Sequence, residues 1–159
     1  MIIQNLKIFS QNVRKNSLIT NTILESYSQF DVLLIQEPPW FEIRKILYSS
    51  NCESEPLIGS CHHPNWIAFT RIPQDKNDFP KVISYVNIRL SSLQFLFRKD
   101  IFNHWDINII SFTNNGVCHY ILNIYSDSSH SALKYLKDTE VNINNVLLMT
   151  GDFNIRDNL

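Results

Sequence analysis

The sequence predicts an α/β domain that is richer in strand than in helix. Short apolar runs of about four to eight residues, separated by turn residues, recur along the 159-residue chain, as expected for strands. Two segments instead repeat apolar residues at helical spacing, one before the second strand and one before the last. No repeat, low-complexity tract or linker divides the chain, and its length suits one core. We therefore expect residues 1–159 to form a single domain.

The first strands are expected at residues 2–12 and 31–37. In the first, alternation places Leu6 and Ile8 on one face. The second, DVLLIQE, is an apolar run closed by a carboxylate and followed by two prolines, which is typical of a strand buried on both faces. A short helix is expected around 41–48.

A helix is expected between these two strands. Asn16 or Ser17 can cap its start, and it should extend to about Tyr27. Ile19, Ile23 and Tyr27 recur at intervals of four residues, so we expect them to form the apolar stripe that faces the sheet.

The rest of the chain alternates strands with turns and ends with a helix and a strand. Strands are expected at 66–71, 81–90, 94–98, 106–113, 118–126 and 144–154. The turn Asn114-Asn115-Gly116 predicts a hairpin between the fourth and fifth of these. A helix is expected from Ser129 to Asn142, with Asp127, Ser128 or Ser129 as its cap.

The charge of the chain does not suggest a polyanion partner by itself. Net charge is −1, with a balance of +2 over residues 1–100 and −3 over 101–159. A nucleic-acid site must therefore be a local patch. The basic residues Arg89, Arg98 and Lys99 are expected to form a solvated face, and contact with a DNA backbone is the alternative.

Cys52, Cys61 and Cys118 are expected to be free thiols without a metal. Their number is odd and they form no CxxC pair, which favours a reducing, intracellular compartment. A zinc cluster with His62 and His63 is the alternative, but the spacing fits no usual ligand pattern. No run approaches the ~18 apolar residues of a membrane span, so no membrane association is expected.

Several strands end in side chains that suit chemistry on a phosphate. Glu37 and Asp152 each close a buried apolar run, at the edge where α/β sheets place their ligands. Asn154 follows Asp152 by two residues and should point the same way. Tyr125 and Asn12 occupy the ends of two further strands. We therefore expect Glu37, Tyr125, Asp152 and Asn154 to converge on one cleft, with Asn12 at its edge.

The order and spacing of these motifs resemble the endonuclease/exonuclease/phosphatase superfamily. The stretches IQEPPW, HHPNWIAFTR, NIYSDSS and LLMTGDFNIRD resemble in particular the endonuclease domain of non-LTR (LINE-type) retrotransposons. This resemblance implies a four-layer α/β/β/α sandwich and cleavage of DNA phosphodiesters with Mg²⁺, or Mn²⁺ in its place. In a full-length element a reverse transcriptase domain would follow, and the nucleus would be the place of action. The resemblance does not imply an oligomeric state or a target sequence.

The resemblance also implies a role for each site residue. Glu37 would be the metal ligand, with Asn12 near the metal and the phosphate. Asp152 would orient or deprotonate the attacking water, and Asn154 and Tyr125 would hold the scissile phosphate. Mg²⁺ keeps several waters and is usually held by one or two carboxylates, so a single Glu at a strand end suffices.

One part of the family pattern lies outside the 159 residues. The family adds a later Asp-His pair and further strands, and His104, His119 and His130 match no family motif. We therefore expect a domain that is incomplete at its C-terminus and cleaves DNA poorly. Two alternatives stay open: a non-catalytic relic of such a domain, and a phosphatase acting on inositol phosphates or lipids.

Overall fold

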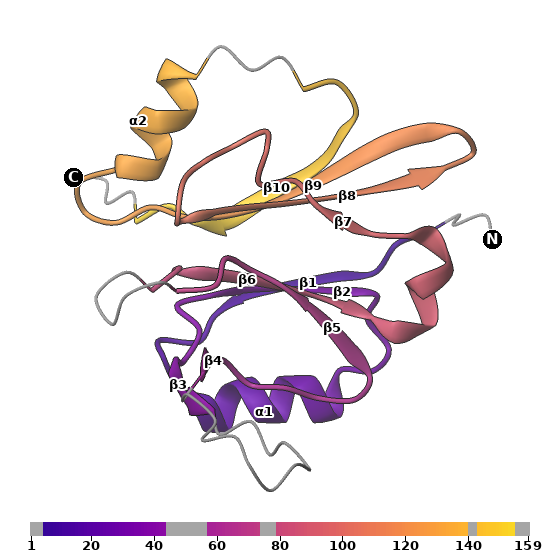
Figure 1. Ribbon diagram of the computed structural model, residues 1–159, viewed down its shortest axis with the longest axis vertical. Helices are drawn as coiled ribbons and strands as arrows, with labels where there is room; N and C mark the ends of the chain where they lie inside the picture. The colour runs from indigo at the N-terminus through magenta and orange to yellow at the C-terminus, as the bar shows by residue number, and fades with distance from the viewer. Residues whose placement is uncertain (1–4, 44–56, 74–78, 140–142, 155–159) are drawn as a thin grey trace, which may run out of the picture.

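The computed structural model describes residues 5–43, 57–73, 79–139 and 143–154, which form two facing β-sheets with one helix outside each (Figure 1). The first sheet contains β1 (Ile8–Asn12), β2 (Val32–Gln36), β5 (Trp66–Phe69) and β6 (Val82–Asn87), with helix α1 (Ser17–Ser26) on its outer side. The second contains β7 (Leu96–Phe97), β8 (Ile107–Asn114), β9 (Val117–Tyr125) and β10 (Val146–Asp152), with helix α2 (Ser131–Asp138) outside it. These mixed sheets with few helices agree with the predicted α/β class.

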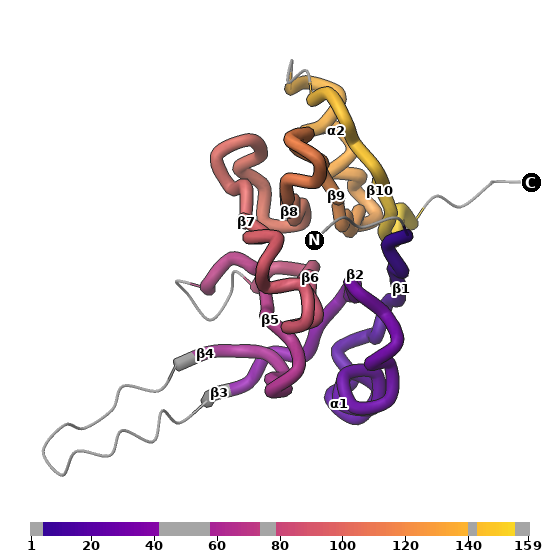
Figure 2. The backbone as a smooth tube through the Cα atoms, turned by 90° about the vertical axis from the view of Figure 1, so that its right-hand side faces the viewer, coloured from indigo at the N-terminus to yellow at the C-terminus, as the bar shows by residue number. Residues whose placement is uncertain are grey.

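The two sheets have matching strand orders, β1-β2-β6-β5 and β10-β9-β8-β7. β1 and β2 are parallel and joined through α1, and β9 and β10 are parallel and joined through α2. The other pairs in both sheets are antiparallel. As Figure 2 shows, β1 and β2 lie against β10 and β9, so the two parallel pairs meet face to face.

Three apolar clusters hold these layers together. Ile23 and Leu24 of α1 pack against Leu33 and Ile35 on one face of β2. The opposite face of β2 contributes to the cluster between the sheets, whose buried members are Val32, Leu34, Val86, Leu90, Leu93, Ile110, Phe112 and Ile121. The third cluster lies between α2 and β8–β9. All five residues of β2 are buried, as the sequence predicted.

Helix α1 begins where the sequence predicted. The Asn16 side chain accepts a 3.0 Å hydrogen bond from the Ile19 amide, which satisfies one of the free N–H groups of the first turn. The expected apolar stripe is wrong at one position, because Ile19 is 38% exposed. The buried face is formed by Thr20, Ile23 and Leu24. Thr20 can be buried because its hydroxyl donates to the Asn16 carbonyl at 2.8 Å.

Two expected elements differ in the structure. Residues 41–43 form strand β3 (Phe41–Ile43), paired with β4 (Leu57–Gly59), and not the start of a helix; the rest of that expected helix lies outside the described residues. The expected strand 81–90 ends at Asn87, whose side chain accepts from the Arg89 amide at 3.2 Å and caps a 3-10 helix, Ile88–Leu93. A local side-chain cap thus overrides the strand propensity of the run.

The last helix is shorter than expected, and its start differs. α2 covers Ser131–Asp138, and Thr139 is already extended. His130 occupies the cap position without a side-chain hydrogen bond. Asp127 organises this start from a distance, because its Oδ1 accepts from the Ser131 amide at 3.2 Å and from the Ser129 hydroxyl at 2.7 Å.

The predicted hairpin is confirmed. β8 and β9 pair from Ile107–Ile124 to Asn114–Val117, and the two-residue turn is Asn115-Gly116. Both turn residues have positive φ, +52° and +76°, which Asn and Gly adopt more easily than other residues.

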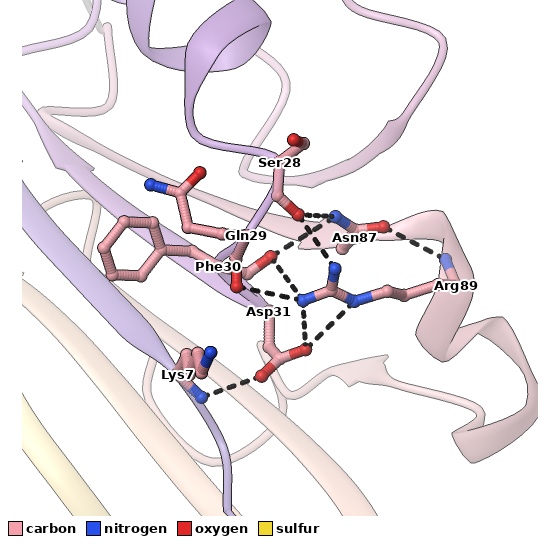
Figure 3. A network of polar contacts seen from close by, with 7 residues as sticks. All are labelled: Lys7, Ser28, Gln29, Phe30, Asp31, Asn87 and Arg89. Atoms are coloured by element: carbon pink, nitrogen blue, oxygen red, sulfur yellow. Dashed lines mark hydrogen bonds and ion pairs between the residues drawn. The ribbon is translucent and has the colours of Figure 1, made fainter.

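At the sheet edge where β1 and β2 begin, Arg89 ties three segments together (Figure 3). Its guanidinium contacts Asp31 Oδ1 at 2.8 Å, and Asp31 Oδ2 accepts from the Lys7 amide at 2.8 Å. The same guanidinium donates to carbonyls that follow α1, those of Ser28, Gln29 and Phe30. Arg89 is therefore anchored within the protein, while its side chain keeps 46% of its surface exposed, in line with the solvated face that the sequence suggested.

Candidate active site at the strand ends

The structure brings the five predicted site residues to one edge of the facing sheets. Asn12 ends β1, Glu37 follows β2, Tyr125 ends β9 and Asp152 ends β10, with Asn154 two residues on. The Asn12 amide nitrogen donates to Glu37 Oε1 at 2.9 Å and to Asp152 Oδ2 at 2.6 Å. One amide from the first sheet therefore joins carboxylates from both sheets.

The backbone at Glu37 turns sharply at the end of β2. Its φ is +48°, which places the residue in the left-handed region. The turn is fixed on both sides, because the Glu37 amide donates to the Lys81 carbonyl at 2.7 Å and the Glu37 carbonyl accepts from the Lys15 amide at 2.7 Å. The carboxylate is consequently directed toward Asn12 and not along the strand.

Gly151 lets β10 approach β9 closely enough to place Asp152. A Cβ at this position would lie 1.7 Å from the Ile124 carbonyl oxygen, which no rotamer can relieve. The strands pair in parallel register from Gly151–Ile124 to Asp152–Tyr125. The glycine of the Gly-Asp pair therefore has a packing role, and it brings Asp152 beside Tyr125.

Asp152 is held through both of its oxygens. Oδ2 accepts from Asn12, and Oδ1 accepts from the Asn154 amide at 3.1 Å. The chain leaves the extended conformation at Asn154, where φ is +46°, and the Asn154 side chain donates to the Ser126 carbonyl at 2.7 Å. Strand alternation predicted that the Asp152 and Asn154 side chains share a side. In the structure the chain turns at Asn154, and the backbone amide of Asn154, not its side chain, contacts Asp152.

The Tyr125 phenol faces the carboxylates. Its pKa is raised above the ordinary value, first by burial and then by the negative charges of Glu37 and Asp152, while a hydrogen bond with Asn154 opposes the shift. A raised pKa keeps the phenol protonated at neutral pH, so its O–H is available as a donor. All five predicted residues thus form one cluster, which we call the strand-end cluster.

Two buried polar side chains, those of Gln36 and Asn123, lie between the sheets next to this cluster. Gln36 donates to the Asn123 side-chain oxygen at 2.6 Å, and Asn123 donates to the Ile35 and Ile83 carbonyls at 3.2 and 3.0 Å. Both side chains are buried between the sheets. Each stands close to a cluster residue, Gln36 one before Glu37 and Asn123 two before Tyr125. In the sequence Gln36 and Asn123 were visible only as neighbours of the motif residues, because no local sequence signal shows that their side chains meet.

Asp106 is a further acidic neighbour that the sequence did not single out. Its carbonyl accepts from the Tyr125 amide at 2.9 Å, and its Oδ1 accepts from the Lys81 amide at 3.2 Å. Burial raises the pKa of this carboxyl. The only signal in the sequence was its position as the first residue of an expected strand.

The donor atoms of the cluster fit a hard divalent cation. The Glu37 and Asp152 oxygens converge on one N–H₂ group, so the positive end of an amide dipole already lies between them. Carboxylate oxygens are the ligands that Mg²⁺ prefers, and it uses few of them. The Asn12 oxygen instead accepts from the Arg14 amide at 2.8 Å. Within the described ranges, no group of three or more His, Cys, Asp or Glu side chains has metal-binding geometry.

The other sequence candidates lie elsewhere. Arg89 is bound to Asp31 at the opposite edge of the sheet, and Arg98 pairs with Asp100 at 2.8 Å. Cys61 and Cys118 are free, as predicted, and Cys52 lies outside the described residues. No helix in the described part of the chain is both long and apolar enough to cross a bilayer.

Comparisons with known proteins identify the fold. No protein-family profile and no curated protein matches the sequence. Among solved structures, the chain is similar to the endonuclease domain of TRAS1, a telomere-specific non-LTR retrotransposon, with a TM-score of 0.63 and 14% sequence identity. The match covers 96% of this chain and 62% of that one. The chain therefore has the fold of the non-LTR retrotransposon endonuclease domains that its motifs resemble.

Proposed function

We propose that this chain is a Mg²⁺-dependent DNA endonuclease domain of the non-LTR retrotransposon type. The observation that carries the proposal is the double hydrogen bond of Asn12, which joins Glu37 and Asp152 across the two sheets of a fold shared with such a domain. The proposal includes the four-layer arrangement of that family. It also includes DNA as the substrate and a reverse transcriptase domain as the neighbour in a full-length element.

We assign each residue of the strand-end cluster the role that the family resemblance implies, and the contacts of each residue are compatible with that role. Glu37 would hold Mg²⁺, with Asn12 beside it, and Mn²⁺ could take the same place. When bound, the ion supplies Lewis-acid activation of the phosphoryl oxygens. Asp152 is oriented by Asn12 and Asn154, so it can position a water and accept its proton.

Tyr125 and Asn154 supply neutral donors for the phosphate. The Tyr125 phenol stays protonated next to two carboxylates. Its O–H can donate a hydrogen bond to a phosphate oxygen when substrate enters. Asn154 is exposed at the end of the cluster and is already anchored to Ser126. Donors fixed in this way cost little reorganisation as charge develops.

We expect the rate to be low. Within the described residues, no hydrogen bond or ion pair joins a histidine to Glu37 or Asp152. A positioned acid–base group contributes about 10²–10⁴-fold to a rate, and among the described residues Asp152 has no imidazole partner.

The test is the nicking of supercoiled plasmid in Mg²⁺ by the chain and by its Asp152→Ala and Glu37→Gln variants. We expect slow nicking by the chain and none above background by either variant. Lys137→Gln is the control, because it removes an exposed charge on α2, outside the cluster, and it should nick as the wild type does. Equal nicking by wild type and Asp152→Ala would refute the catalytic assignment.

A second measurement separates metal binding from catalysis. A ligand that binds only the folded state raises its thermal stability, so Mg²⁺ should raise the melting temperature of the wild type and have little effect on Glu37→Gln. Binding without nicking would favour the non-catalytic relic. Release of phosphate from inositol phosphates, with plasmid left intact, would favour the phosphatase.

A further inference from the structure

A groove with aromatic and cationic walls opens on the same edge as the strand-end cluster, at the other end of the sheets. It has a volume of about 760 Å³, and its walls include Arg71, Ile72, Phe97, Lys99, Asn103 and Trp105. No acidic side chain of the described residues lines it.

The strand directions place the groove and the cluster on one edge. β5 is antiparallel to β6, which is antiparallel to β2, so Arg71 leaves β5 on the side where Glu37 leaves β2. Trp105 precedes β8, whose first residue Ile107 pairs with Ile124 near the end of β9.

The distance from the groove to the cluster is one that a few nucleotides of a DNA strand can span. The cluster is formed at the ends of β1, β2, β9 and β10, and the groove at β5 and β7, two to three strand spacings along each sheet. At about 4.8 Å per spacing this is about 10–14 Å. A strand of B-DNA rises about 3.4 Å per nucleotide, so the separation corresponds to roughly three or four nucleotides, or fewer if the strand is stretched.

The Arg71 side chain is held in the groove by hydrogen bonds and by contacts with aromatic rings. The Arg71 guanidinium donates to the Phe102 carbonyl at 2.6 Å and to the His104 carbonyl at 3.2 Å. It also lies 6.0 Å from the centre of the Phe97 ring and 5.9 Å from that of Trp105. Arg71 therefore fixes the loop that carries Trp105 and holds a positive charge between two aromatic rings.

The groups that remain available match the parts of a nucleotide. Trp105 is 36% exposed, so its indole can stack with a flat base. Lys99 and Asn103 are exposed, and no ion pair engages the Lys99 ammonium within the described residues. Such an ammonium can neutralise a phosphate.

We propose that this groove binds an unpaired nucleotide of the DNA strand that flanks the cleaved phosphate, with the base against Trp105 and a phosphate at Lys99. A positively charged groove with exposed aromatic rings is how proteins hold single-stranded nucleic acid without sequence preference. The inference rests on the proposed function for its substrate, but it makes a separate statement about binding.

The test is the binding of fluorescent oligothymidylate, measured by anisotropy in EDTA, so that no cleavage is involved. Trp105→Ala should weaken binding about 5- to 150-fold, the range found for loss of one stacked base. Lys99→Gln should reduce the slope of log K against log salt by about 0.7. Lys137→Gln, an exposed lysine on α2 outside the groove, is the matched control and should change neither quantity.

A second variant at Trp105 distinguishes loss of base stacking from loss of folding. Trp105→Phe keeps a ring for stacking, so it should bind nearly as tightly as the wild type but lose the quenching of tryptophan fluorescence that oligothymidylate produces. Wild-type affinity in Trp105→Ala, or no binding by the wild type, would overturn the groove. Preferential binding of a duplex of equal length would also overturn it. Plasmid nicking in Mg²⁺ judges the proposed function separately.

Discussion

The Gln36 side chain donates a 2.6 Å hydrogen bond to the Asn123 side chain, and this contact joins the two sheets directly behind Glu37 and Tyr125. Both residues are buried, Gln36 at 2% exposure and Asn123 at 0%. In such surroundings a hydrogen bond is strong, and an unpaired amide is costly. The pair therefore fixes the relative position of the strands that carry the site.

This pair gives the first prediction. Gln36→Leu and Asn123→Leu should each lower the free energy of unfolding by about 1–3 kcal/mol, because each leaves the other amide without its partner. The double variant should lose less than the sum of the two, since neither amide is then left facing a leucine. Urea unfolding of the four proteins measures the coupling. Additive losses would show that the two side chains act independently.

Gly151 should tolerate no side chain. Gly151→Ala places a methyl group 1.7 Å from the Ile124 carbonyl oxygen, so β10 must move away from β9 and Asp152 with it. We expect a loss of unfolding free energy at the high end for a point variant, more than about 4 kcal/mol. Gly116→Ala is the control, because nothing lies within 4 Å of its Cβ and only the positive φ disfavours alanine. Comparable stability of the two variants would contradict the packing role.

The Tyr125 phenol should lose its proton at a higher pH than an ordinary tyrosine does. Its raised pKa means that the folded state holds the phenolic proton more tightly than the unfolded chain does. The resulting stability is present below the unfolded pKa of about 10 and is lost as pH rises through the folded pKa. Ultraviolet titration of wild type and Tyr125→Phe identifies the transition. Asp152→Asn should move it to lower pH, because one of the opposing charges is removed; an unchanged transition would show that the carboxylate has no influence.

Arg89 should contribute to the stability of the fold and not to DNA-binding affinity. Arg89→Gln breaks the contact with Asp31 and frees three carbonyls after α1, so we expect a loss of about 1–2 kcal/mol in urea unfolding. Arg98→Gln should cost less than Arg89→Gln, because its partner Asp100 lies two residues away and is 63% exposed. Affinity for oligothymidylate should be unchanged in Arg89→Gln. Weaker DNA binding with unchanged stability would restore the alternative of a backbone contact.

Much of the site could be predicted because its signals are local. Glu37 and Asp152 each close an apolar run, and an apolar run followed by a carboxylate is visible within a few residues. The turn at Asn115-Gly116 was visible for the same reason. The contact of Asn12 with both carboxylates could not be predicted from the sequence, because it depends on how the two sheets pack against each other.

Local competition explains the elements that were wrong. The run 81–90 has strand propensity throughout, but the Asn87 side chain caps a 3-10 helix and ends the strand. Residues 41–43 pair with Leu57–Gly59, a partner that a helical reading of the segment cannot reveal. In α1, Ile19 fits the apolar spacing, yet the sheet contacts the adjacent face and leaves Ile19 exposed.

The hydrogen bond from Asn12 to Asp152 spans 140 residues of chain. Contacts of such high sequence separation form late in folding, because closing a long loop costs entropy before any contact repays it. A chain still emerging from the ribosome carries Asn12 and Glu37 long before Asp152 exists to meet them. The strand-end cluster consequently forms only after β10 has been synthesised and has packed against β1, so a shorter nascent chain carries Asn12 and Glu37 without the bridge to Asp152.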